Sequence, residues 1–129
     1  MKNFNNQPVV SVIMSVKDNI KNYLQQSIES ILNQNFKNFE FIIIADGSNK
    51  ETTNVLDFYN SKDDRIILIK QSNKGLTNSL NKAILASKTD YILRQDFDDI
   101  SNIDRISEQY KFMNENPKIA VCGTSCLKI

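Results

Sequence analysis

Short apolar runs recur along this chain and are separated by longer, more polar segments. Five runs are rich in Val and Ile and are mostly continuous rather than alternating; they cover residues 9–14, 39–44, 65–69, 90–93 and 119–122. Continuous apolar runs of this length are typical of strands buried on both faces, as in a parallel sheet. The pattern therefore predicts five strands.

The segments between the runs carry apolar residues at helical spacing. Four stripes predict four helices: Tyr23, Leu24, Ile28, Ile31 and Leu32; Val55, Leu56 and Tyr59; Leu76, Leu80, Ala83, Ile84 and Ala86; and Ile103, Ile106, Tyr110 and Met113. We expect residues 101–104 to open the last helix as a capping box, and Asn116-Pro117 to end it. Alternating strands and helices predict an α/β fold, an open and mainly parallel sheet with helices on both faces.

Length and charge limit the classes of function. The 129 residues fit a single domain, 1–129, and its 16 basic and 15 acidic residues give a net charge of +1, so no nucleic-acid partner is expected. The polar N-terminus does not resemble a secretory signal, and no apolar run approaches the roughly 20 residues of a membrane helix. We therefore expect a cytoplasmic protein. This location is also compatible with peripheral membrane association of a full-length protein.

The chain has no histidine, which excludes a Ser-His-Asp triad, a Cys-His pair and a His-ligated zinc. Two cysteines, Cys122 and Cys126, are too few for a structural zinc site, and we expect them to be small buried apolar residues. Any chemistry must therefore use carboxylates, Lys, Arg, hydroxyls, backbone N–H groups or a hard metal ion.

Polar residues follow each of the first four predicted strands, at residues 15–18, 46–48, 71–75 and 94–99. In an open parallel sheet, ligands bind beyond the carboxyl ends of the strands, so these four segments are expected to lie on one rim. The segment 94–99 holds three carboxylates, Asp96, Asp98 and Asp99. Such a cluster suits a divalent cation, and in an extended stretch Asp96 and Asp98 share a face. The alternative is a polar turn that leads into the next helix, with one Asp as its cap.

Two shorter polar segments each allow a structural and a functional interpretation. Asp46-Gly47-Ser48 is either a turn after a strand or a carboxylate that accepts from a nucleobase or ribose, with glycine allowing close approach. Lys74-Gly75 precedes a predicted helix start, where a lysine and free backbone N–H groups suit a phosphate, or it is a solvated loop. The chain has only three glycines and no Walker or Gly-x-Gly-x-x-Gly motif, which argues against a glycine-cradled dinucleotide or triphosphate.

Five segments together resemble family 2 of the inverting glycosyltransferases, which have the Rossmann-like GT-A fold. Residues 9–15 resemble the opening strand of that family, 27–34 its first helix, 39–48 its second strand and Asp-Asp-Gly-Ser turn, and 73–83 its third helix. Residues 91–101, with Asp104-Arg105 behind them, resemble its Asp-x-Asp metal motif. The resemblance covers nearly the whole chain in order and spacing.

The resemblance implies a transferase that binds a nucleotide-diphospho-sugar, commonly a UDP-sugar, with Mn²⁺ or Mg²⁺. By analogy, Asp46 binds the base, Ser15 lies near the nucleotide and Lys74 reaches it; Asp96 faces the ribose or sugar, and Asp98 ligates the metal that bridges the diphosphate. Asp99 is expected to be structural at the helix entry. Family members continue into a half that binds a glycan or lipid-linked acceptor and supplies the catalytic base, so we expect this chain to be a fragment without that base.

Two departures from the family pattern support an alternative, a non-catalytic glycosyltransferase-like binding module. Lys17 stands where the family has an aromatic residue, and Ala45 stands where it has the first acidic residue of its turn. A nucleotidyltransferase is a weaker alternative, because residues 15–19 do not form the glycine-rich basic loop that it requires.

Overall fold

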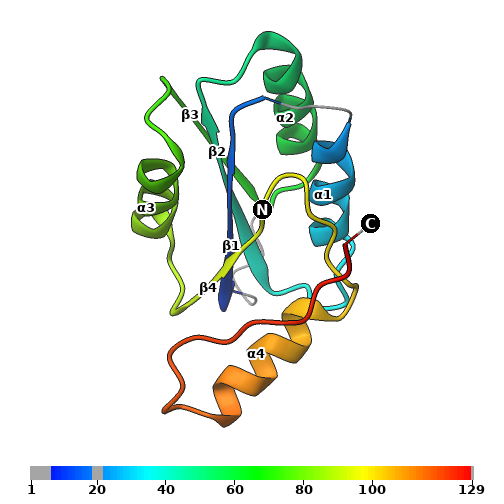
Figure 1. Cartoon of the computed structure of the whole chain (residues 1–129), viewed down its shortest axis with the longest axis vertical. Helices are drawn as coiled ribbons and strands as arrows, with labels where there is room; N and C mark the ends of the chain where they lie inside the picture. Colours follow the sequence, from blue (N-terminus) through cyan, green and yellow to red (C-terminus); the bar gives the residue numbers. More distant parts are fainter. Residues whose placement is uncertain (1–6, 19–21, 129) are drawn as a thin grey trace.

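Four of the five predicted strands form one parallel sheet in the order β3-β2-β1-β4 (Figure 1). The computed structural model describes residues 7–18 and 22–128. The strands are β1 (Val10–Val16), β2 (Phe39–Asp46), β3 (Ile66–Gln71) and β4 (Tyr91–Arg94). The predicted α/β class is confirmed, because every pairing is parallel and a helix joins each strand to the next in the chain.

The helices are α1 (Tyr23–Leu32), α2 (Lys50–Lys62), α3 (Leu76–Ala86) and α4 (Arg105–Glu115). They match the four predicted stripes, except that Ile103 lies before α4, and α4 ends before Asn116-Pro117 as expected. In the parts of the chain that the structure describes, each helix is too short or too polar to cross a membrane.

The side chains of β1 point alternately to the two faces of the sheet, and each face is covered by different helices. Val12 and Met14 belong to the larger buried cluster, which includes residues of α1 and α2 and Ile106 of α4. Ile13 belongs to a smaller cluster with Ala83 of α3. Successive strand residues point to opposite faces, so a strand covered on both sides must be apolar throughout. Figure 1 shows the same layers, with α3 on one side of the sheet and α1 and α2 on the other.

The predicted fifth strand is wrong. Residues 119–122 have no regular secondary structure, and Val121 is 84% exposed. A β-branched apolar run forms a strand only when a neighbouring strand satisfies its backbone groups, and none of the described strands pairs with this segment. The segment instead follows α4 back across the molecule (Figure 1).

Two smaller expectations are also wrong. Helix α4 begins at Arg105 with no side-chain cap, because the hydroxyl of Ser101 donates to Gln95 instead of capping the helix. Cys126 is exposed and Cys122 is only half-buried, so the cysteines are not core residues. Both lie in the irregular segment that was predicted to hold the fifth strand.

Candidate functional site

The carboxyl ends of the four strands lie along one edge of the sheet, and several hydrogen bonds join the loops that follow them. The hydroxyl of Ser48 donates to the carbonyl of Val16 at 2.9 Å, and the Asn49 N–H donates to the Asp18 carboxylate at 3.0 Å. These contacts connect the segments after β1 and β2. The expected rim of polar strand ends is therefore joined by hydrogen bonds where β1 and β2 end.

Asp46, the last residue of β2, is only 3% exposed and accepts three hydrogen bonds. Its Oδ1 accepts from the backbone N–H of Lys74 at 2.7 Å and from Nε2 of Gln71 at 2.9 Å. Its Oδ2 accepts from the backbone N–H of Gly75 at 2.9 Å. Two of the predicted site residues, Asp46 and Lys74, are therefore in direct contact.

Burial alone would raise the pKa of Asp46, but the hydrogen bonds from Lys74, Gln71 and Gly75 favour the charged form more strongly. The net effect holds the pKa of Asp46 below its ordinary value. Asp46 is thus a buried carboxylate that the start of α3 stabilises as an anion.

This contact changes the interpretation of the Lys74-Gly75 segment. In the phosphate-binding interpretation the backbone N–H groups of Lys74 and Gly75 would be free for a ligand, yet both donate to Asp46. The protein's own carboxylate therefore occupies part of the anion-binding capacity of this helix start. The side chain of Lys74 is exposed and remains available to a ligand.

Gly47 allows the loop after β3 to approach this closely. It has φ of +68°, and a Cβ at this position would lie 2.9 Å from both the backbone nitrogen and the Cβ of Asn73. A side chain here would clash with the backbone as well as strain its own conformation. The glycine of the Asp46-Gly47-Ser48 turn is therefore required by the protein itself, whether or not a nucleotide is bound.

Ser15 lies half-buried near the end of β1, in register with Ile44 of β2. Alternation places Ser15 on the same face of the sheet as Ile13, which packs toward α3. Along β2, the side chain of Asp46 points to the same face as those of Ile42 and Ile44, which belong to that cluster. Ser15 and Asp46 therefore share the α3 side of the edge.

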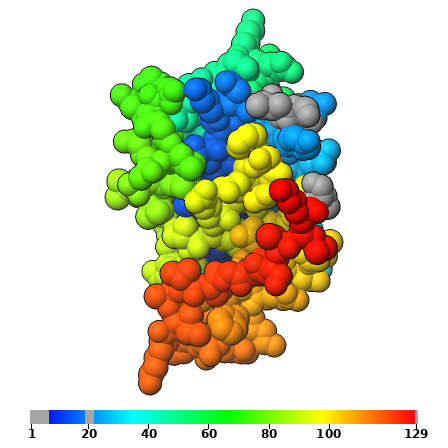
Figure 2. Space-filling view, in the orientation of Figure 1, coloured from blue at the N-terminus to red at the C-terminus, as the bar shows by residue number. Residues whose placement is uncertain are grey.

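The acidic segment after β4 is a turn rather than an extended stretch. The Asp99 N–H donates to the carbonyl of Asp96 at 3.2 Å, which closes the turn across Phe97 and Asp98. The argument that Asp96 and Asp98 share a face, made for an extended chain, does not hold for this geometry. Figure 2 shows this loop (yellow) on the surface between α3 (green) and α1 (light blue).

The carboxylates of Asp96 and Asp98 have different surroundings. Asp96 Oδ1 accepts from Arg94 Nε at 2.9 Å, in an ion pair whose side chains are about half exposed. Asp98 is exposed, and its carboxylate has no hydrogen bond or ion pair with the residues that the structure describes. Asp98 is thus the freer of the two carboxylates.

This donor set fits a hard divalent cation that is completed by a ligand. Mg²⁺ sites in nucleotide enzymes often use one or two carboxylates together with substrate phosphates. Across residues 7–18 and 22–128, no three His, Cys, Asp or Glu side chains converge on a point where they could enclose a metal ion. A metal ion bound by Asp98 would therefore need further ligands from a bound molecule.

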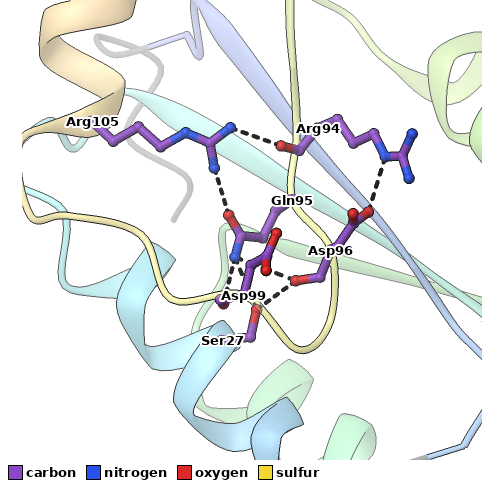
Figure 3. A network of polar contacts seen from close by, with 6 residues as sticks. All are labelled: Ser27, Arg94, Gln95, Asp96, Asp99 and Arg105. Carbon is purple, nitrogen blue, oxygen red and sulfur yellow. Dashed lines mark hydrogen bonds and ion pairs between the residues drawn. The ribbon is translucent and has the colours of Figure 1, made fainter. Parts of the chain in front are cut away.

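A buried polar network, which the sequence interpretation missed, lies directly behind this turn (Figure 3). Gln95 is 1% exposed and contacts Ser27 of α1, Ser101 and Arg105. One signal in the sequence points to it, since alternation places Gln95 on the same face as the buried Leu93.

Arg105, the first residue of α4, completes the network. Its Nη1 donates to Gln95 Oε1 at 2.7 Å and its Nη2 to the carbonyl of Arg94 at 3.0 Å. Burial lowers the pKa of Arg105, while the charges of Asp99 and Asp96 oppose that shift. The backbone of Asp99 closes the turn and accepts from Gln95, which agrees with a structural role, although Asp99 lies six residues before α4.

Two solved structures that share this fold were determined with nucleotide ligands. A mannosyltransferase, PcManGT from Pyrobaculum calidifontis in complex with GDP-Man and Mn²⁺, superposes with a TM-score of 0.74 at 16% identity. TarS of S. aureus (residues 1–349) in complex with UDP gives 0.69 at 21% identity. Each match covers 84% of this chain and 33% of the other. The expected Rossmann-like GT-A fold is confirmed by these similarities.

Sequence comparison shows the family. An uncharacterized glycosyltransferase of Methanocaldococcus jannaschii is 42% identical over 115 residues, which are 88% of this chain and 40% of that relative. The chain thus spans two fifths of that relative's length. The model of the family described as glycosyl transferase family 2 matches residues 11–126, nearly the whole chain and every strand-end segment described above. The chain therefore belongs to glycosyl transferase family 2.

Proposed function

We propose that this chain is the donor-binding domain of a glycosyltransferase. It binds a nucleotide-diphospho-sugar, a UDP-sugar in the first instance, with Mn²⁺ or Mg²⁺ at the carboxyl edge of the sheet. The observation that carries this proposal is the carboxyl edge of the sheet, where Ser15, the Asp46–Lys74 contact and the exposed Asp98 lie at the ends of parallel strands. The ligands of the two neighbouring structures support the donor class.

The proposed reaction breaks the bond between the anomeric carbon and the diphosphate oxygen. The leaving nucleoside diphosphate keeps the electron pair and gains negative charge, while an acceptor hydroxyl attacks with inversion and loses its proton to a base. A divalent cation, when bound, stabilises the charge on the leaving diphosphate. We propose that the base comes from a part of a longer protein that also binds the glycan or lipid-linked acceptor.

The residues of this chain bind and orient the donor. Asp98 would hold the cation that stabilises the charge of the diphosphate, and Asp96 would face the ribose or sugar from its ion pair with Arg94. Ser15 lies near the nucleotide, and the exposed ammonium group of Lys74 reaches it.

Asp46 contributes to the nucleotide site with a carboxylate that already has three donors. An ionised carboxylate has about four lone-pair sites, and the hydrogen bonds from Gln71, Lys74 and Gly75 use three of them.

Calorimetry with UDP, in the presence and absence of Mn²⁺, tests the proposal on this chain directly. Asp98→Asn is expected to abolish the Mn²⁺-dependent gain in UDP affinity and to leave the fold intact. Asp64→Asn is the matched control, because Asp64 is an exposed carboxylate just before β3, at the opposite edge of the sheet. An unchanged Mn²⁺-dependent gain in Asp98→Asn would remove Asp98 as the ligand.

Asp46→Ala is expected to weaken UDP binding with and without metal, because it removes a nucleotide contact and releases the Lys74-Gly75 segment. Loss confined to the metal-dependent part would contradict the role proposed for Asp46. If the unaltered chain bound no UDP in either condition, the non-catalytic binding module would be the better description. Efficient sugar transfer by these 129 residues alone would overturn the proposal that the base lies elsewhere.

A further inference from the structure

We propose that Gln95 is a positioning residue that fixes the turn carrying Asp96 and Asp98, and that it sets the metal-dependent part of donor binding. The inference rests on the proposed function, because it concerns the same site. Gln95 follows β4 directly, and its backbone N–H donates to the carbonyl of Ile13 at 3.0 Å, so it is anchored to the sheet. Its side chain is 1% exposed and lies between the turn, α1 and α4 (Figure 3).

The amide nitrogen of Gln95 holds both ends of the turn. Nε2 donates to the carbonyl of Asp99 at 2.7 Å and to Ser27 Oγ at 3.0 Å. The hydroxyl of Ser27 in turn donates to the carbonyl of Asp96 at 2.9 Å. The direct contact from Nε2 to the Asp96 carbonyl is longer, at 3.3 Å, so the two amide hydrogens serve Asp99 and Ser27 best. One side chain therefore connects the residues on either side of Phe97 and Asp98.

The amide oxygen of Gln95 connects the turn to α4. Oε1 accepts from Ser101 Oγ and from Arg105 Nη1, both at 2.7 Å. The acceptor half of the side chain therefore fixes the approach to α4, while the donor half fixes the turn. A substitution that keeps one half and removes the other separates the two effects.

Asp98 depends on this backbone support because its own carboxylate has no partner among the described residues. Among the described residues, the turn that carries Asp98 is what sets its position. Groups that orient a metal ligand from behind typically change metal affinity by about 10–100-fold when removed. Asp96 has a side-chain partner in Arg94, so its position depends less on Gln95.

Gln34 provides a matched control. It is also a fully buried glutamine, and its amide bonds the carbonyls of Ser30 and Asn102 and the N–H of Ile106. None of these groups belongs to the turn 96–99. Loss of the Gln34 amide should destabilise the fold as loss of the Gln95 amide does, without moving Asp98.

The experiment measures UDP affinity by calorimetry with and without Mn²⁺, and Mn²⁺ binding in the presence of UDP by electron paramagnetic resonance. The variants are Gln95→Leu, Gln95→Glu, Ser27→Ala and Gln34→Leu, with unfolding midpoints recorded for each. Gln95→Glu keeps the acceptor half and loses both amide hydrogens. Ser27→Ala removes the hydroxyl that accepts from Gln95 Nε2 and donates to the Asp96 carbonyl, leaves the bond from Gln95 to the Asp99 carbonyl in place, and is the mildest change.

We expect Gln95→Leu and Gln95→Glu to reduce the Mn²⁺-dependent gain in UDP affinity about tenfold or more, with metal-free UDP affinity unchanged. Ser27→Ala should give a smaller loss of the same kind, which keeps the test decisive even if a Gln95 variant fails to fold. Gln34→Leu should lower the unfolding midpoint and keep the full gain.

Unchanged gains in the folded Gln95 variants and Ser27→Ala would overturn the proposal. An equal loss of the gain in Gln34→Leu would also overturn it, because the effect would then follow general stability. If the unaltered chain shows no Mn²⁺-dependent gain, the proposed function fails first and the role of Gln95 fails with it. The two failures can be told apart, because failure of the Gln95 proposal alone leaves the Mn²⁺-dependent gain in UDP affinity present in the unaltered chain and in the Gln95 variants.

Discussion

Substitution of Asp46 by Asn tests whether the protein's own hydrogen bonds make this carboxylate a stabilising anion. Asp46 is 3% exposed and accepts from Lys74 N–H, Gln71 Nε2 and Gly75 N–H. An asparagine of the same shape keeps one acceptor atom and turns the other into an NH₂ group. That NH₂ group must face at least one N–H donor, so one contact becomes repulsive and the others lose their charge.

The expected cost follows from these contacts. Hydrogen bonds to charged groups contribute about 1.5–3 kcal/mol each, and neutral ones about 0.5–1.5 kcal/mol. Losing one charged bond and weakening two others outweighs the relief of no longer burying a charge. We therefore expect Asp46→Asn to lower the free energy of unfolding by about 2 kcal/mol near neutral pH. Asp98→Asn is the control, because Asp98 is exposed and unpaired among the described residues, and should change stability by less than about 0.5 kcal/mol.

The pH dependence gives the sharper test. The pKa of Asp46 in the folded protein lies below its ordinary value, because the donors outweigh the effect of burial. Its stabilising contribution is therefore fully present above the unfolded-state pKa of about 4 and is lost as pH falls through the folded-state pKa. Urea unfolding followed by circular dichroism should show the gap between the unaltered chain and Asp46→Asn narrowing as pH falls below about 4. A gap of equal size at neutral and acidic pH would refute this account of the carboxylate.

Two further outcomes follow from other parts of the fold. Burial, the hydrogen bond to Glu29 and the charge of Glu29 raise the pKa of Tyr59 to about 12. The contribution of Tyr59 to stability is therefore present below the unfolded-state pKa of about 10 and is lost as pH rises through about 12. The difference between the phenolate absorbance titrations of the unaltered chain and Tyr59→Phe should give a midpoint near 12 for Tyr59. A midpoint near 10 would contradict this. Gly47→Ala should cost about 2 kcal/mol or more in urea unfolding, because of its positive φ and the approach to Asn73, whereas Gly123→Ala, with open space around it, should be near neutral. Equal effects at the two glycines would show that the contact at Gly47 is not restrictive.

The strands of the sheet could be predicted because each is encoded by consecutive residues in the sequence. Strands buried on both faces must be apolar at consecutive positions, and the runs at 9–14, 39–44, 65–69 and 90–93 satisfy that requirement. The run at 119–122 has the same composition and is not a strand, since composition does not supply a neighbour for pairing. The start of α4 was misplaced for a related reason, because the hydroxyl of Ser101 bonds Gln95 instead of the helix.

The sequence by itself determined where polar residues follow strands, and hence the edge at which Ser15, Asp46, Lys74, Asp96 and Asp98 lie. Only the tertiary structure decided what each carboxylate meets there. Asp46 is stabilised as an anion by backbone N–H groups from a loop 28 and 29 residues away, whereas Asp98 is left exposed on a turn that a buried glutamine holds from behind. Strand formation depends on neighbours in sequence, but the partners of a side chain are chosen by packing between distant segments, and no local pattern encodes them.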